Sequence, residues 1–166
     1  MTLLLQVTAV AAILVGPIAV LASFLNEEIE KKYPVTEYVF FINSILLLLA
    51  FLGIYLFQVD ETGEMGLLGF IAILIGSMFS MFPDKVAGMQ GWEFGGLFIA
   101  LGTILFAIAT YSAGLFPQLV PIAFAAGILF GIPSIFVKSY QRLGYILGAV
   151  GFGLGTVAAG IFMLAA

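Results

Sequence analysis

Ser134 and Lys138 are the two side chains whose types and spacing come closest to a catalytic pair. Side chains spaced i,i+4 lie on one face of a helix, and a serine beside an activated lysine can act as a nucleophile. An activated lysine must be desolvated, but Lys138 directly follows a hydrophobic span and is interpreted as an exposed interfacial anchor. The sequence therefore predicts no catalytic residue and no enzymatic activity.

Two acidic segments offer carboxylates that a cation could bind. Glu27, Glu28 and Glu30 follow the first hydrophobic span, and residues 60–64 contain three more acidic side chains. Consecutive positions on a helix do not converge on one point, and Glu27 is spaced i,i+4 from Lys31 in the order that favours a helix. We interpret the first segment as a solvated helix end and the second as an exposed external turn, so no metal site is predicted.

Cysteine and histidine are absent from the sequence, which removes several kinds of site. Without cysteine there is no disulfide, thiolate ligand or thiol nucleophile. Without histidine there is no imidazole ligand for haem or metals and no histidine acid–base chemistry. A net charge of −4 also lacks the basic footprint of a nucleic-acid-binding protein. We expect no cofactor and no nucleic-acid partner.

Hydrophobic residues make up 63% of the chain and charged residues only 8%, against about a quarter charged in soluble domains. Apolar stretches of about 20 residues are typical of transmembrane helices. Residues 45–49 are apolar at every position, whereas a membrane strand would alternate. The sequence predicts an all-α polytopic transmembrane helical bundle, one integral membrane domain over residues 1–166. Its six spans are 3–25, 39–59, 67–82, 96–116, 121–137 and 145–165.

The basic residues all fall in the loops after the first, third and fifth spans. Cytoplasmic loops of membrane proteins carry an excess of lysine and arginine. Loops 26–38, 83–95 and 138–144 are therefore predicted to be cytoplasmic and both termini to lie outside. The first span lacks a basic start, which favours an uncleaved helix over a signal peptide. The basic residues are Lys31, Lys32, Lys85, Lys138 and Arg142.

Small residues recur at steps of three and four in five of the six spans, where they permit close helix packing. The second span is bulky nearly all round and is predicted to lie at the edge of the bundle. Polar residues inside the spans are expected to bond between helices, Asn43 above all. A cavity lined by the small and polar residues is the alternative. Candidate packing or cavity-lining residues are Asn43, Thr103, Thr110, Gly151 and Gly155, and Pro17 is the candidate hinge.

Residues 55–58, 61–70 and 109–117 resemble segments of small prokaryotic multi-pass membrane proteins of uncharacterised function. The resemblance implies a six-helix integral membrane protein of a prokaryotic plasma (inner) membrane. It implies no activity, cofactor or functional residue.

Two classes of function follow. The first is a non-enzymatic scaffold or subunit of a membrane complex, packed through its small-residue seams against homo- or hetero-oligomeric partners. The second is a passive channel or carrier for a neutral or lipid-like small solute. The absence of ionised residues inside the spans argues against a proton-coupled pump.

Overall fold

The computed structural model describes residues 2–25, 35–80, 85–86 and 88–166, which form six helices and one short hairpin. This confirms the predicted all-α class. Five helices are long and apolar enough to cross a membrane, and the apolar part of the remaining one is Phe41–Phe57. The helices are α1 (Leu3–Ser23), α3 (Val35–Phe57), α4 (Val59–Ser80), α5 (Gly91–Ala113), α6 (Leu119–Phe136) and α7 (Gln141–Ala165).

The hairpin lies within the segment predicted as a loop. Strand β1 (Lys85–Val86) pairs antiparallel with β2 (Met89–Gln90), so that Lys85 lies opposite Gln90. Gly88 at its turn has a φ of 83°, a conformation that glycine adopts without steric cost.

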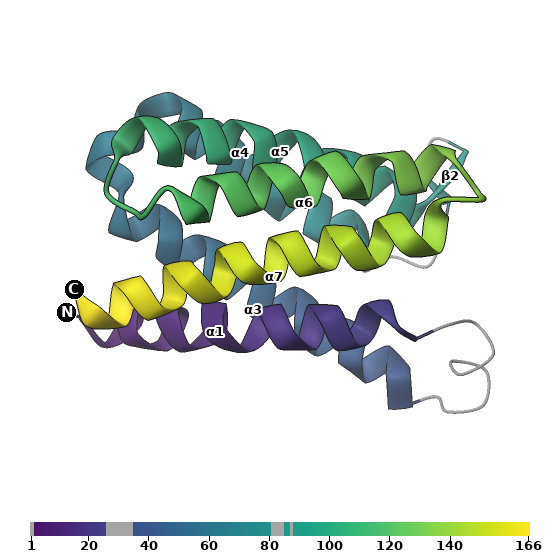
Figure 1. The fold of residues 1–166 in the computed structure, drawn as a ribbon, viewed down its shortest axis with the longest axis horizontal. Helices are drawn as coiled ribbons and strands as arrows, with labels where there is room; N and C mark the ends of the chain where they lie inside the picture. The colour runs from purple at the N-terminus through teal and green to yellow at the C-terminus, as the bar shows by residue number, and fades with distance from the viewer. Residues whose placement is uncertain (1, 26–34, 81–84, 87) are drawn as a thin grey trace.

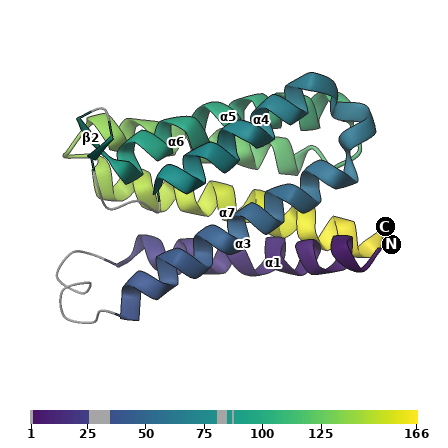
Figure 2. The same cartoon turned by 180° about the vertical axis from the view of Figure 1, so that it is seen from behind.

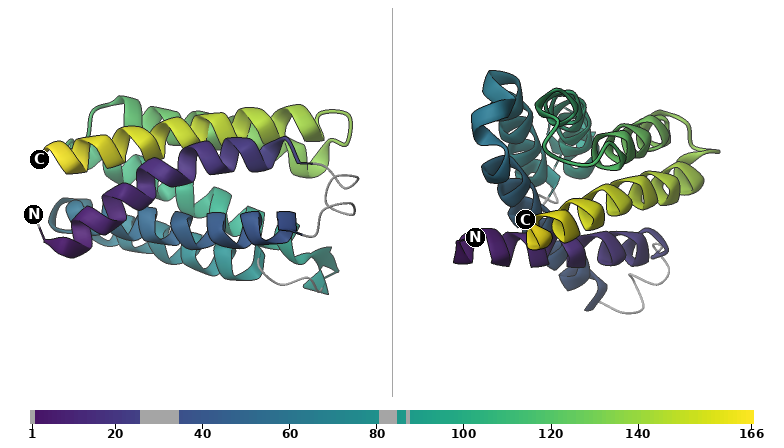
Figure 3. Two further views of the ribbon diagram at one scale, coloured as in Figure 1. Left: turned by 90° about the horizontal axis from the view of Figure 1, so that it is seen from below. Right: turned by 60° about the vertical axis from the view of Figure 1, so that its left-hand side comes forward.

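The six helices form a ring in chain order (Figures 1 and 3). Each helix packs against the next, and α7 closes the ring against α1. The pairs α4–α5 and α6–α7 have the most extensive contacts, while α3 and α4 have the least of any successive pair. In Figure 2, α3 runs obliquely across the ring and approaches α4 only near the turn that joins them.

Both termini lie at one end of the ring, together with the α3–α4 turn and the α5–α6 turn (Figure 2). We call this the terminal end. The β1–β2 hairpin and the α6–α7 turn lie at the opposite end, which we call the hairpin end (Figure 1). The chain thus returns to its starting end after six helices; that this end lies outside the cell stays a prediction.

Glycine allows the closest helix pairs to approach backbone to backbone. A Cβ added at Gly69 in α4 would lie 2.8 Å from the backbone nitrogen of Phe106 in α5, and one at Gly76 would lie 2.6 Å from the carbonyl oxygen of Gly95. Real side chains do not tolerate such distances, so these positions accept only glycine without movement of a helix. The close contact of α5 with α4 therefore runs through Gly95 and Gly102, one residue before Thr103, which was the predicted packing or cavity-lining residue.

Helix α7 carries two glycine faces because it lies between α6 and α1. On one face, a Cβ at Gly151 would lie 2.7 Å from the Cα of Gly127 in α6. On the other, a Cβ at Gly160 would lie 2.6 Å from the carbonyl oxygen of Ala9 in α1. The sequence analysis identified the first face and missed the second.

Phenylalanine side chains fill the middle of the ring. The ring of Phe51 in α3 lies 5.2 Å from that of Phe106, 5.3 Å from that of Phe124 and 5.4 Å from that of Phe152. Phe51, Phe106 and Phe124 are fully buried. Aromatic pairs at these separations stabilise a core beyond the area they bury.

The prediction that the second span lies at the edge of the bundle is therefore wrong for its C-terminal half. Ala50, Phe51 and Ile54 of α3 are among the most buried residues of the protein. Only the N-terminal half is peripheral, where Phe41 and Ile45 are exposed. Bulky side chains suit a lipid-exposed surface, but they also suit the wide centre of a six-helix ring, which small residues cannot fill.

Candidate functional site

The buried polar groups near the terminal end form the most distinctive feature of the interior. Gln58 lies between α3 and α4 and is 1% exposed. Its Nε2 donates a hydrogen bond of 2.8 Å to Oγ1 of Thr110 in α5, which is equally buried. This bond joins side chains 52 residues apart in the sequence. It is a bond between helices of the kind expected for polar residues inside the spans. The sequence analysis missed Gln58, because a glutamine at the end of a span and next to an acidic loop is expected to face water.

The backbone carbonyl of Gln58 also stabilises the first turn of α4. The Gln58 carbonyl accepts hydrogen bonds from the backbone amides of Glu61 and Thr62, each at 3.0 Å, and from Oγ1 of Thr62 at 3.1 Å. Asp60 and Glu61 occupy the first turn of α4, where carboxylates favour the helix dipole. This segment was predicted as an exposed turn. It is the first turn of a helix instead, with Thr62 buried and Asp60, Glu61 and Glu64 exposed.

Helix α4 breaks one turn later at Gly63, where φ is 55° and ψ is −154°. Residues with a side chain rarely adopt this combination. Nothing lies within 4 Å of a Cβ placed there, so the backbone conformation rather than space requires glycine. Pro17, the candidate hinge, lies within the continuous helix α1, beside Gly16, which packs against Gly153 of α7.

Several buried polar atoms accept or donate no hydrogen bond within the part of the chain that the structure describes. They are Asn43 Oδ1, Gln58 Oε1, Ser77 Oγ and Thr103 Oγ1. Asn43 was expected to bond across helices, and its side-chain oxygen has no such partner among these residues. Thr103 and Thr110 are spaced i,i+7 on α5, about 10 Å apart along the axis. The structure therefore joins Thr110 to Gln58 and leaves Thr103 as a separate buried hydroxyl.

Several hydroxyls in the helices bond to carbonyl oxygens of their own helix. Oγ1 of Thr8 donates to the Leu4 carbonyl at 3.0 Å, and Oγ1 of Thr156 donates to the Gly153 carbonyl at 3.0 Å. Such bonds satisfy a hydroxyl without holding a neighbouring helix. The expectation that polar residues bond between helices is thus met by Gln58–Thr110 and not by these residues.

The Ser134–Lys138 pair does not form a helical i,i+4 pair. Helix α6 ends at Phe136, and Val137 is extended, so Lys138 lies beyond the helix and is exposed. Oγ of Ser134 is buried and donates to the Gly131 carbonyl at 2.5 Å. Of the carboxylates considered for cation binding, Glu27, Glu28 and Glu30 lie outside the described residues.

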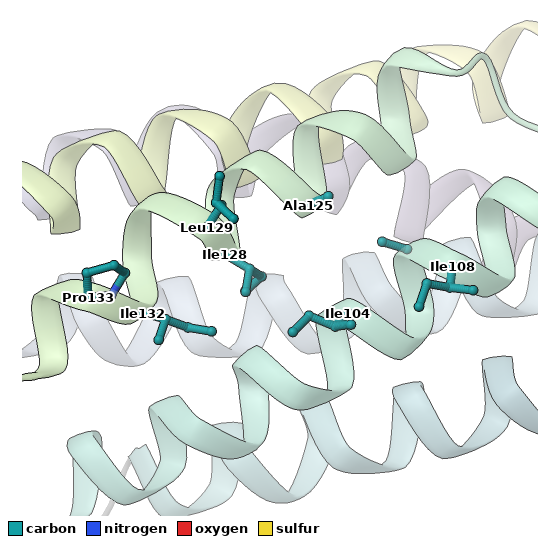
Figure 4. A pocket seen from close by; sticks show the side chains of 8 residues that line it. Ile104, Ile108, Ala125, Ile128, Leu129, Ile132 and Pro133 are labelled. Atoms are coloured by element: carbon teal, nitrogen blue, oxygen red, sulfur yellow. The ribbon is translucent and has the colours of Figure 1, made fainter.

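A groove of about 440 Å³ runs along the outer surface between α5 and α6 (Figure 4). Such a volume lies within the range of roughly 300–1,000 Å³ of ligand sites. The lining is almost wholly apolar, with branched side chains on the walls and alanines between them. It consists of Ile104, Ala107, Ile108, Ala125, Ile128, Leu129, Ile132 and Pro133.

A second pocket of about 250 Å³ lies at the α5–α6 turn, at the terminal end, and polar and apolar atoms line it in similar measure. Its lining residues are Tyr111, Gly114, Phe116, Gln118 and Pro121. Of the remaining predicted residues, Gly151 packs against Gly127, and Gly155 lies against the ring of Phe124. Neither glycine lines the groove or this pocket.

Comparison with known proteins finds no match to any family model, curated protein or solved structure. The class defined by the fold is an all-α bundle with five helices able to cross a membrane.

Proposed function

We propose that this protein is a non-enzymatic integral membrane protein of a prokaryotic plasma membrane that serves as a scaffold or subunit of a membrane complex. Large apolar side chains exposed on every helix support the membrane part of the proposal, because water would not tolerate so much apolar surface. The apolar groove between α5 and α6 carries the scaffold part.

The glycine seams do not supply the surface for a partner. Gly69, Gly76, Gly127 and Gly160 already pack against helices of the same chain. A partner would need a different surface, and the groove between α5 and α6 is concave, apolar and unoccupied by the described part of this chain. Its isoleucine walls are stiff at χ1, so the groove is shaped before anything binds. We propose a transmembrane helix of a partner, or of a second copy, as the occupant.

Filling the groove should weaken the complex. Ile104→Trp places a large ring in the groove, whereas Leu14→Trp places the same ring on the exposed face of α1, which packs against α3 and α7. Crosslinking in membranes and native mass spectrometry in mild detergent would measure the complex. We expect Ile104→Trp to reduce the affinity of the complex about tenfold or more, equivalent to about 1.4 kcal/mol, and Leu14→Trp to leave it unchanged. An isolated monomer in the unmodified protein, or equal effects of both changes, would contradict the proposal.

The proposed orientation places the terminal end outside and the hairpin end in the cytoplasm. Lys138 and Arg142 lie at the hairpin end, and loops 26–38, 83–95 and 138–144 contain every basic residue of the sequence. The positive-inside rule supports this orientation.

A passive carrier or channel for a neutral or lipid-like small solute is the second candidate. The side-chain oxygens of Gln58, Ser77 and Thr103 favour it, since they have no hydrogen-bond partner among the described residues and a solute could bond to them. The packed rings of Phe51, Phe106 and Phe124 oppose it, because they fill the bundle centre. Purified protein in vesicles would decide: solute-specific flux above that of protein-free vesicles supports a carrier, and equal flux across a panel of neutral solutes counts against it.

A further inference from the structure

The apolar groove and the half-polar pocket at the α5–α6 turn lie on the same face of the same two helices. On α5, Ile104 and Ile108 line the groove and Tyr111 lines the pocket, at steps of four and three residues that keep side chains on one face. On α6, Pro121 lines the pocket and Ala125 lines the groove, again four residues apart. Three or four residues make about one helical turn, or roughly 5 Å. The groove therefore leads into the pocket within about one turn on both helices.

The lining changes from apolar to polar towards the terminal end. Apolar atoms line the groove almost wholly, whereas the pocket has Tyr111 and Gln118 as its polar side chains, and both are exposed. The pocket lies where α5 ends and α6 begins. A membrane that embeds the helices would therefore place it at the level of the headgroups, where tyrosine is enriched.

The length of this face matches one leaflet of a bilayer. Helix α6 rises about 16 Å from Pro121 in the pocket to Ile132 in the groove, at 1.5 Å per residue. The hydrocarbon core of a bilayer is about 30 Å thick, so one leaflet accounts for about 15 Å of it. An occupant with a polar end in the pocket and an apolar chain along the groove would extend from the headgroups to about the middle of the bilayer. A phospholipid has this shape.

The charges at the terminal end distinguish between kinds of phospholipid. The five residues that line the pocket include no ionised side chain. The charged side chains that the structure describes at this end are all carboxylates, those of Asp60, Glu61 and Glu64 (Figure 2). They would repel a lipid with a net negative charge and attract a headgroup that carries an ammonium group.

We propose that the groove and the pocket together bind one phospholipid with an amine headgroup, such as phosphatidylethanolamine. An acyl chain lies along α5 and α6, and the Tyr111 hydroxyl and the Gln118 amide donate hydrogen bonds to the phosphate oxygens. This inference rests on the proposed membrane insertion but not on the proposed scaffold role. A partner helix that docks in the groove would displace the acyl chain, so the lipid is the occupant of the protein without its partner.

Native mass spectrometry in mild detergent measures the lipid and the complex separately, as the added mass of one lipid and as the mass of an oligomer. Phosphatidylethanolamine is compared with phosphatidylglycerol, which has a net negative headgroup, at identical acyl chains. We expect one bound lipid and about two- to fivefold tighter binding of phosphatidylethanolamine, as an exposed charge interaction implies. Asp60→Asn, Glu61→Gln and Glu64→Gln together should abolish this preference. Absence of a retained lipid, equal binding of both lipids, or a preference that survives these changes overturns the proposal.

Matched variants locate the headgroup. Tyr111→Phe combined with Gln118→Leu removes the polar side chains of the pocket and should weaken phosphatidylethanolamine binding about threefold or more, as loss of hydrogen bonds implies. Tyr38→Phe combined with Gln141→Leu makes the same changes at exposed residues near the starts of α3 and α7 and should change nothing. Equal binding by these two proteins would show that the headgroup does not occupy the pocket.

A second pair of variants locates the acyl chain. Ile104→Trp fills the groove and should weaken lipid binding, whereas Leu14→Trp should not. If the two proteins bind the lipid equally, the groove is not part of the site. A protein that forms the complex in detergent but retains no lipid contradicts this inference alone. Recovery of the protein without detergent contradicts both this inference and the proposed membrane insertion.

Discussion

At the scale of single residues, two glycines of α6 differ in how closely α7 approaches them and can be compared by the same substitution. A Cβ at Gly127 would lie 2.8 Å from the backbone nitrogen of Phe152, whereas one at Gly131 would lie 3.8 Å from its nearest neighbour, the Cα of Gly148. Gly127→Ala should force α6 and α7 apart and destabilise the protein by about 1–3 kcal/mol. Gly131→Ala should be neutral or stabilise by up to about 1 kcal/mol, because alanine favours a helix.

Thermal unfolding in one detergent would compare these two variants with the unmodified protein. Equal melting temperatures for Gly127→Ala and Gly131→Ala would contradict the close approach of α6 and α7 at Gly127.

Also at the residue scale, the sequence predicted only one member of the buried Gln58–Thr110 pair. Thr103 and Thr110 stand out as polar positions within an apolar span, so their burial was predictable. Gln58 precedes Asp60 and Glu61 and could equally have faced water. Its burial depends on the turn that brings the end of α3 against α5, a tertiary contact that residue types alone do not indicate.

At the scale of elements, the break in α4 makes a specific prediction. Gly63→Ala introduces a side chain where φ is 55° and ψ is −154°, and strain of this kind costs about 1–3 kcal/mol. We expect a corresponding loss of unfolding free energy, measured by thermal or denaturant unfolding. Glu64→Ala at the exposed neighbouring position is the control and should have little effect. If Gly63→Ala is as stable as this control, the backbone at residue 63 is not as described.

Most helices could be predicted from the length of the apolar stretches, but the ends of the helices and their places in the bundle could not. The helix that contains the third span begins at Val59, because Asp60, Glu61 and Thr62 form a helical turn that hydropathy assigns to a loop. The β1–β2 hairpin has only two residues in each strand and is too short to give a periodic pattern. The place of α3 was predicted wrongly because bulky residues suit both a lipid surface and the centre of a ring.

At the scale of the whole molecule, glycines lie where neighbouring helices pack around the ring, and phenylalanines fill its centre. Glycine contacts draw α4 to α5, α6 to α7, and α7 to α1, which closes most of the circumference. The six-helix circumference leaves a centre too wide for small residues, and Phe51, Phe106 and Phe124 fill it. Large apolar side chains, including those that line the groove between α5 and α6, are left exposed on the outer surface of the ring.

The most direct test of the proposed insertion of the ring in a membrane is single-cysteine labelling in intact cells, which needs no background correction because the sequence has no cysteine. Gln118→Cys changes the α5–α6 turn at the terminal end, and Ser139→Cys changes the α6–α7 turn at the hairpin end. Leu101→Cys changes an exposed residue near the middle of α5. A membrane-impermeant maleimide should label the first in intact cells and the second only after lysis. It should label the third only after denaturation. Labelling of Leu101→Cys in native membranes, or recovery of the protein from the soluble fraction without detergent, would contradict the account.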